Sequence, residues 1–235
     1  MNSSPVCSGP SASVGSAVTF RQGDGSVPGS AETDDQFGAA VAYGRLRFPT
    51  RVDIVIGVPR EDLESQGLGD TGCVYVFSGT VPPADCSFAD SLSSQLLARP
   101  GQLTGSALAS GRDWDLDGLD DLLVGIPGDD SGQSARSGSV VLVNGSRFGI
   151  NFEGLFRLGN EATSFGNYGS SLAFVGSREE GLTQLDLLIG EPGYDDPVQD
   201  IDRSGRITST FLPIGMIFGN GFESGDLSGW DLAVP

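Results

Sequence analysis

Four aspartates, Asp113, Asp115, Asp117 and Asp121, have the residue type and the spacing that would hold a hard metal cation. The first three stand at alternate positions, Gly118 follows them, and the fourth precedes an apolar run. A backbone that turns tightly at the glycine would point several carboxylate oxygens at one ion, and Ca²⁺ takes roughly six to eight oxygen ligands in flexible geometry. The spacing therefore predicts a Ca²⁺ site. Mg²⁺ fits it less well, because that ion demands a stricter octahedron and keeps its waters.

Two other interpretations of this stretch explain the residues less well. An EF-hand loop opens with the same spacing, but it needs a bidentate Glu at its twelfth position, which here is Val124. A solvated acidic turn would not need the apolar residues Trp114, Leu116 and Leu119 between its carboxylates. Converging carboxylates without a cation would also raise one another's pKa, and a divalent ion reverses that penalty.

The composition excludes several kinds of chemistry. The chain of 235 residues contains no His, and all 13 of its basic residues are Arg. His-ligated zinc and the Ser-His-Asp and Cys-His forms of nucleophilic catalysis are therefore absent, and we expect no catalytic residues. The net charge of -18 makes nucleic acid and anionic membranes poor partners and cations good ones.

Three sequence landmarks each recur three times, at intervals of roughly 65 residues. The first is an aromatic or small residue before Gly, followed by a run of small and apolar residues, at 37–42, 104–109 and 168–173. The second is Asp, three apolar residues and Gly-x-Pro, at 53–59, 121–127 and 186–192. The third is a small residue and Gly opening a strand, at 71–77, 137–143 and 204–208.

This repeat predicts an all-β fold of three small antiparallel sheets. Thirty-six Gly and 13 Pro residues separate short apolar runs, and helix has little support. The apolar runs before Gly-x-Pro are short and unbroken, as in strands buried on both faces, and each should end at its proline. Sheets stacked on copies of themselves in a radial array form a β-propeller, so we predict three propeller-type blades.

The landmarks resemble the FG-GAP repeats of the integrin α-chain head over about residues 30–210. That resemblance implies propeller blades, some of which hold Ca²⁺ in loops of the type Asp-x-Asp-x-Asp-Gly-x-x-Asp. It implies that Asp113, Asp115, Asp117 and Asp121 supply side-chain ligands and that Leu119 supplies a backbone carbonyl. The corresponding loops of the first unit (45–51) and of the third (177–184) lack this pattern, so we predict no metal in either.

The domain organisation follows from the repeat. Residues 1–12 are expected to be a disordered arm, and 13–21 could form a first strand. The three units span about 13–80, 81–146 and 147–210, and a composition shift near Phe211 marks a C-terminal tail or the start of a further module over 211–235.

Export is expected, although no stretch has the features of a signal peptide or of a membrane span. In an exported protein a Cys73 to Cys86 disulfide is plausible, and idle or buried thiols are an equal alternative. The segment 219–230 also resembles a short Gly-Phe-Glu-Ser-Gly-Asp segment of secreted bacterial proteins, which implies a secreted or cell-surface location.

The first functional hypothesis is a non-catalytic, Ca²⁺-binding module that binds a protein or carbohydrate ligand or serves adhesion in an exported protein. The alternative is an accessory domain of a secreted hydrolase whose catalytic residues lie outside this chain. Three units are fewer than the four or so blades of a closed propeller. We therefore expect a partial or open propeller, with three alternatives: a fragment of a longer propeller, a ring completed by self-association, or an open arc with exposed apolar faces at its ends.

Overall fold

The described part of the chain is all-β in a computed structural model. It comprises residues 19–23, 27, 30–63, 67–78, 99–130, 135–147, 151–159, 165–175 and 184–213. These residues form ten strands in three antiparallel sheets and contain no helix. None of them therefore belongs to a helix that is long and apolar enough to cross a membrane.

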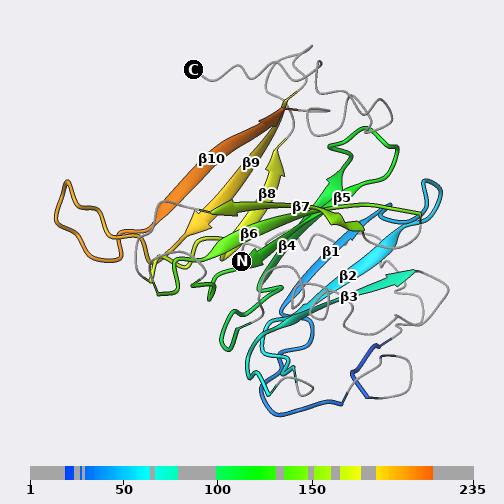
Figure 1. The fold of residues 1–235 in the computed structure, drawn as a ribbon, viewed down its shortest axis with the longest axis horizontal. Helices are drawn as coiled ribbons and strands as arrows, with labels where there is room; N and C mark the ends of the chain where they lie inside the picture. The colour runs from blue at the N-terminus through cyan, green and yellow to red at the C-terminus, as the bar shows by residue number, and fades with distance from the viewer. Residues whose placement is uncertain are drawn as a thin grey trace, which may run out of the picture.

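Each sheet is built from consecutive strands (Figure 1). The first sheet contains β1 (Ala40–Gly44), β2 (Asp53–Val58) and β3 (Cys73–Ser78). The second contains β4 (Ala107–Arg112), β5 (Asp121–Ile126), β6 (Ser139–Asn144) and β7 (Asn151–Gly159). The third contains β8 (Ser171–Val175), β9 (Gln184–Glu191) and β10 (Arg206–Pro213).

The three landmarks of the repeat correspond to the first three strands of each sheet. The central strands β2, β5 and β9 end at the residue before Pro59, Pro127 and Pro192. Proline has no N–H to donate to a neighbouring strand, so the strand ends there, as the sequence predicts. The predicted β fold and its division into three sheets are confirmed.

Two of the three apolar clusters of the core lie between sheets, and the third lies within the first unit. The apolar cluster between the first and second sheets contains Leu46, Val55, Val74, Leu122, Val124, Ile126, Val141 and Val143. The cluster between the second and third sheets contains Trp114, Leu123, Val140, Leu142, Tyr168, Leu187 and Ile189. Residues of β5 alternate between these clusters, and all six are buried. The prediction of a strand buried on both faces is therefore confirmed for β5.

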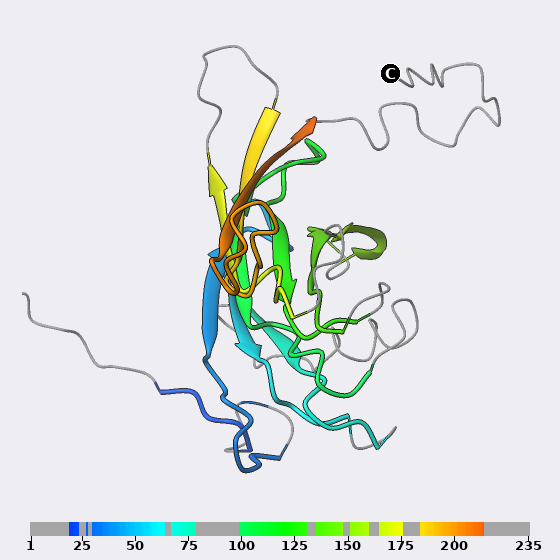
Figure 2. The ribbon, with the colours of Figure 1, turned by 90° about the vertical axis from the view of Figure 1, so that its left-hand side faces the viewer.

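Neighbouring sheets meet like blades, with their first strands β1, β4 and β8 in contact. In Figure 2 β1 (blue) and β8 (yellow-green) lie along one side of the molecule, whereas β7 (olive green) lies on the opposite side. At each junction a glycine of one sheet is bridged to the start of the next unit, Gly72 to Thr104 and Gly138 to Tyr168. The sheets are therefore stacked in the same way at both junctions.

Some boundaries differ from the expected units. The segment 151–159, which the repeat boundaries assign to the third unit, is the fourth strand of the second sheet. It forms an antiparallel pair with β6, to which a short connection joins it. β10 runs on to residue 213, past the composition shift near Phe211.

The N-terminal arm (1–12) and most of the C-terminal tail (214–235) lie outside the described residues. Of the strand expected at 13–21, only 19–21 are described, and they are not in a strand. Cys73 is disulfide-bonded. The two other cysteines, Cys7 and Cys86, lie outside the described residues, so the predicted Cys73 to Cys86 pairing stays a prediction.

Candidate metal centre

A bulge at the end of β4 starts the acidic loop. The register between β4 and β5 shifts between Ser110 and Arg112, and Gly111 between them has φ +100°. Such a backbone conformation suits glycine, because a residue with a side chain rarely adopts it. The Ser110 hydroxyl donates to the Asp121 carbonyl over 2.8 Å, which ties the two ends of the loop together.

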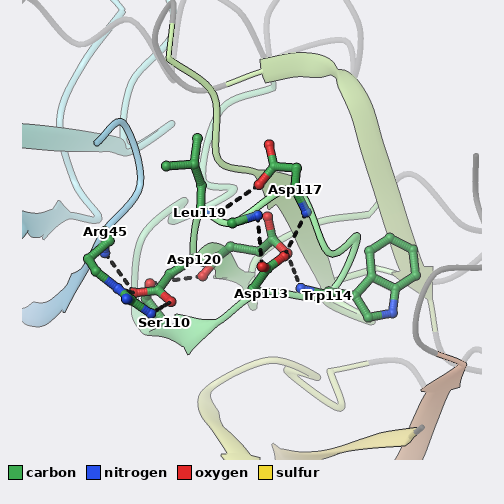
Figure 3. Close-up of polar contacts among 9 residues, drawn as sticks. Arg45, Ser110, Asp113, Trp114, Asp117, Leu119 and Asp120 are labelled. Atoms are coloured by element: carbon green, nitrogen blue, oxygen red, sulfur yellow. Dashed lines mark hydrogen bonds and ion pairs between the residues drawn. The ribbon is translucent and has the colours of Figure 1, made fainter. Parts of the chain in front are cut away.

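The loop brings three of the predicted ligands together. One carboxylate oxygen from each of Asp113, Asp115 and Asp117 can be chosen so that all three lie within 4.8 Å of one another. Figure 3 shows the Asp113 carboxylate beside the Asp117 N–H, and the Asp117 carboxylate beside the Leu119 N–H. The Asp117 N–H donates to Asp113 Oδ1 over 3.1 Å and to Asp115 Oδ1 over 3.2 Å. These bonds stabilise a tight turn of the backbone beside the carboxylates, as the spacing predicts.

The fourth aspartate has a different environment. Both Asp121 oxygens accept backbone bonds, from the Trp114 N–H over 2.6 Å and from the Gly145 N–H over 2.9 Å. Asp121 is fully buried and does not belong to the group of three. Burial raises its pKa from 3.8 to about 7, against the lowering effect of the two backbone bonds. Each of its oxygens keeps a further lone pair, since a carboxylate has about four acceptor sites.

The electrostatics of the loop disfavour three free negative charges. Burial raises the pKa of Asp115 above its usual value, and the neighbouring charges of Asp117 and Asp113 raise it further. No ion pair to these three aspartates occurs among the described residues. A divalent cation would favour the ionised form of each carboxylate and remove the repulsion.

Asn144, at the end of β6, completes the polar surroundings of the loop. Its Nδ2 donates to Asp115 Oδ2 over 2.8 Å, and its buried Oδ1 has no hydrogen-bond partner. A buried amide oxygen without a donor is costly, and an amide oxygen is also a ligand that Ca²⁺ accepts. The donor set, carboxylates and one amide beside a turned backbone, therefore fits a hard cation.

The loop is held from both sides by packing. Trp114 is 2% exposed and lies in the core between the second and third sheets, and Leu119 is equally buried. From the first sheet, the Arg45 carbonyl accepts the Asp120 N–H over 3.0 Å, and the Arg45 N–H donates to Asp120 Oδ2 over 2.7 Å (Figure 3). The loop is thus held at the point where the first two units meet.

The first unit treats the equivalent carboxylate differently. Asp53, the counterpart of Asp121, is fully buried and pairs with Arg47 at 2.7 Å between Nη2 and Oδ1. The Arg47 N–H also donates to Asp53 Oδ2 over 3.0 Å. A guanidinium therefore neutralises this aspartate. Most of the third unit's loop, and the side chain of Asp186, lie outside the described residues.

Sequence reasoning missed two residues of this region. Asn144 lies far along the chain from the aspartates, and its signal is a single polar residue that ends the apolar run Val140–Val143. Arg45 belongs to another unit, and its bond to Asp120 crosses between sheets. The carbonyl of Leu119 stays a predicted ligand from the resemblance alone.

The fold and the acidic loop define an all-β repeat protein with blade-like sheets and a candidate site for a divalent cation. No protein-family model matches this chain. Human (Homo sapiens) integrin alpha-X is similar to it, with 35% identity over 95 residues. The similar stretch covers 40% of this chain and 8% of the human protein, so the chain spans far less than the length of that relative.

Proposed function

We propose that the chain is a non-catalytic, Ca²⁺-binding module that serves adhesion or macromolecular binding in an exported protein. The observation that carries the metal proposal is the convergence of Asp113, Asp115 and Asp117 within 4.8 Å, with no arginine paired to them among the described residues. The contrast with Asp53, which is neutralised by Arg47, supports it. The similarity to integrin alpha-X supports the adhesive role and a cell-surface or secreted location.

Asp113, Asp115 and Asp117 would hold the ion with their side chains, Leu119 with its carbonyl, and Asp121 with the free lone pairs of its carboxylate. The bound ion would supply positive charge and no redox or acid chemistry. Asp121 would also orient the loop through its bonds to the Trp114 and Gly145 N–H groups. The role of the ion would be structural, because the loop leads directly into the buried strand β5.

The metal proposal is tested by thermal unfolding during a CaCl₂ titration. An ion that binds only the folded chain stabilises it by about 2.7 kcal/mol at 100 times its dissociation constant, so the midpoint should rise with Ca²⁺ and fall with chelator. Asp115→Asn should abolish this shift. Asp202→Asn should keep it, because Asp202 is exposed on a turn of the third unit and makes no hydrogen bond or ion pair within the described residues.

Mg²⁺ at the same concentrations should shift the midpoint much less, since it retains its waters and needs stricter geometry. Calorimetric titration measures the binding itself. The metal proposal fails if calorimetry detects no Ca²⁺ binding at millimolar concentration, or if Asp115→Asn and the wild type respond alike.

The adhesive role is tested separately, with immobilised extracellular proteins and glycans. We expect a ligand that is retained in Ca²⁺ and released when a chelator unfolds the loop. A chain that binds Ca²⁺ but none of the presented proteins or glycans would contradict the adhesive role and leave the metal proposal standing.

A further inference from the structure

The third sheet carries the same groove that receives the next unit at the two existing junctions. A Cβ added at Gly57 or Gly125 would overlap with the carbonyl oxygen of Gly105 or Gly169, so that turn of the next unit lies directly on the glycine. Gly190 is the third member of this set, and the three atoms nearest to a Cβ added there all belong to Ser171 of its own sheet. A groove of about 600 Å³ lies there instead, lined by residues that include Gly190, Gly205 and Ile207.

The backbone beside this groove has the same φ as the residues whose carbonyls accept hydrogen bonds at the other two junctions. Asp70, Arg136 and Arg203 are non-glycine residues with φ of 51°, 49° and 51°. At the first junction the carbonyl of Asp70 accepts the Leu103 N–H over 3.2 Å, and at the second the carbonyl of Arg136 accepts the Asn167 N–H over 3.1 Å. The carbonyl of Arg203 accepts no bond from the described residues, although its φ is the same.

The first sheet carries the turn that would fit this groove. Gln36 and Gly38 have φ of 60° and 89°, close to the 58° and 86° of Leu103 and Gly105, which fill the first junction. Gln36 and Gly38 are exposed, and a Cβ at Gly38 would meet nothing within 4 Å. The Phe37 N–H makes no hydrogen bond with the described residues, whereas the Thr104 N–H at the same position donates across the junction over 3.0 Å.

The apolar side chains beside the groove and the turn are also uncovered. Val74 and Val140 place a Cγ2 methyl 3.1 and 3.0 Å from the Cβ position of Gly105 and Gly169. Their counterpart Ile207 is 74% exposed. On the first sheet, Val41 pairs with Ile56 and is 67% exposed, whereas its counterpart Leu108 packs into the core between two sheets.

We infer that two copies of this chain associate head to tail, with the turn Gln36–Gly38 of one copy seated in the Gly190 groove of the other. One chain carries both the groove and the turn, and the φ values of Arg203, Gln36 and Gly38 are close to those of the equivalent residues at the two existing junctions. Phe20 contacts Phe77 of β3, and Val27 belongs to an apolar cluster with residues of β2 and β3, against which Phe37 also packs. Gln36, Gly38 and the β1 residue Val41 stay exposed. Two such junctions would stack six sheets, which is within the four to eight blades of closed propellers.

The inference is tested by light scattering after size exclusion and by sedimentation equilibrium. Because each chain carries a net charge of -18, the buffer should contain at least about 0.15 M salt, where the Debye length is about 8 Å. We expect a mass twice that of one chain at about 100 µM, which would detect a dissociation constant in the micromolar range. A single-chain mass throughout would overturn the inference.

Two variants on opposite faces show whether the junction is head to tail. Ile207→Arg and Val41→Arg should each raise the dissociation constant at least about tenfold, since each places a charge in the apolar contact. A mixture of the two variants should recover dimers, because one intact groove and one intact turn remain. Val198→Arg is the control, because Val198 is 91% exposed and is not among the residues that line the Gly190 groove.

Circular dichroism should show all three variants folded, since the substituted side chains are exposed. Dimers that persist in Ile207→Arg or Val41→Arg would overturn the inference. Two variants that both lose the dimer and fail to recover it when mixed would also overturn it, because that result indicates a face that pairs with itself.

Discussion

Gly125 and Gly190 are equivalent positions of the second and third sheets, but only Gly125 is in close contact with a glycine of the next unit, so alanine should destabilise the chain far more at Gly125. Gly125→Ala places a methyl group against the Gly169 carbonyl of the third unit, which is backbone and is tied to Gly190 by the Gly169 N–H over 3.0 Å. Gly190→Ala places the same methyl against the Ser171 hydroxyl, which can rotate away. The first change must move two sheets apart, and the second need only move one side-chain atom.

The magnitudes follow from this difference. Overpacking a well-packed core costs about 1–3 kcal/mol, and Gly125→Ala should lie at or above the upper end because the obstructing atom cannot rotate. Gly190→Ala should cost less than about 1 kcal/mol, since alanine also loses less conformational entropy than glycine on folding. For a domain of this size the two midpoints should differ by roughly 4–12 °C.

Urea unfolding at equilibrium measures both changes in free energy, in a Val41→Arg background, which prevents the pairing of copies without changing the strand next to Gly190. Gly190→Ala combined with Ser171→Ala is a useful control, because it removes the hydroxyl oxygen that lies nearest to the added methyl group. Equal losses at the two positions, or a larger loss at Gly190, would refute the view that Gly125 is required by the neighbouring unit.

Two further predictions concern buried charges of the first unit. Burial raises the pKa of Glu61 from 4.5 to about 7. Between pH 4.5 and about 7, Glu61 is therefore protonated in the folded chain and ionised in the unfolded chain. Stability should therefore fall as pH rises through this window, by less than about 3 kcal/mol because Glu61 is partly exposed. Glu61→Gln should reduce the pH dependence of the urea midpoint between pH 5 and 8 and leave the share that Asp121 contributes without Ca²⁺; an unchanged slope would contradict this assignment. Arg47→Gln should cost about 3–5 kcal/mol by leaving the buried Asp53 without its cation, whereas Arg51→Gln, which removes only a contact with the exposed Phe48 ring, should cost under about 1 kcal/mol. Similar urea midpoints for Arg47→Gln and Arg51→Gln would contradict the assignment of Arg47 as the partner that stabilises the buried Asp53.

The parts of the fold that were predictable are those set by local chemistry. The runs before Pro59, Pro127 and Pro192 become central strands because each is apolar and ends where a backbone donor is missing. β7 carries none of the landmarks, and its place in the second sheet depends on pairing with β6. The exact edge of a unit was therefore not readable from the repeat, since neighbouring units share the connection between them.

The candidate site divides in the same way. Asp113, Asp115 and Asp117 lie within five residues, and the backbone bonds of one turn bring their oxygens together, so spacing alone predicted them. The contact of Asn144 with Asp115 joins residues 29 apart, and that of Arg45 with Asp120 joins residues 75 apart. Such contacts depend on how strands and sheets pack, which a pattern of spacing does not contain.

Asp53 and Asp121 show how one repeat position can meet the same physical demand in two ways. Each is a fully buried carboxylate at the start of a central strand, and each needs positive charge or donors around it. The first unit supplies Arg47 from its own loop, which neutralises Asp53. The second unit supplies the Trp114 and Gly145 N–H groups as donors to Asp121. Three further aspartates belong to the same loop, and the proposed cation would balance their negative charge. The loop carries both Trp114, which lies in the core between the second and third sheets, and Asp120, which bonds to Arg45 of the first unit. Removal of that cation should therefore loosen both junctions of the second sheet.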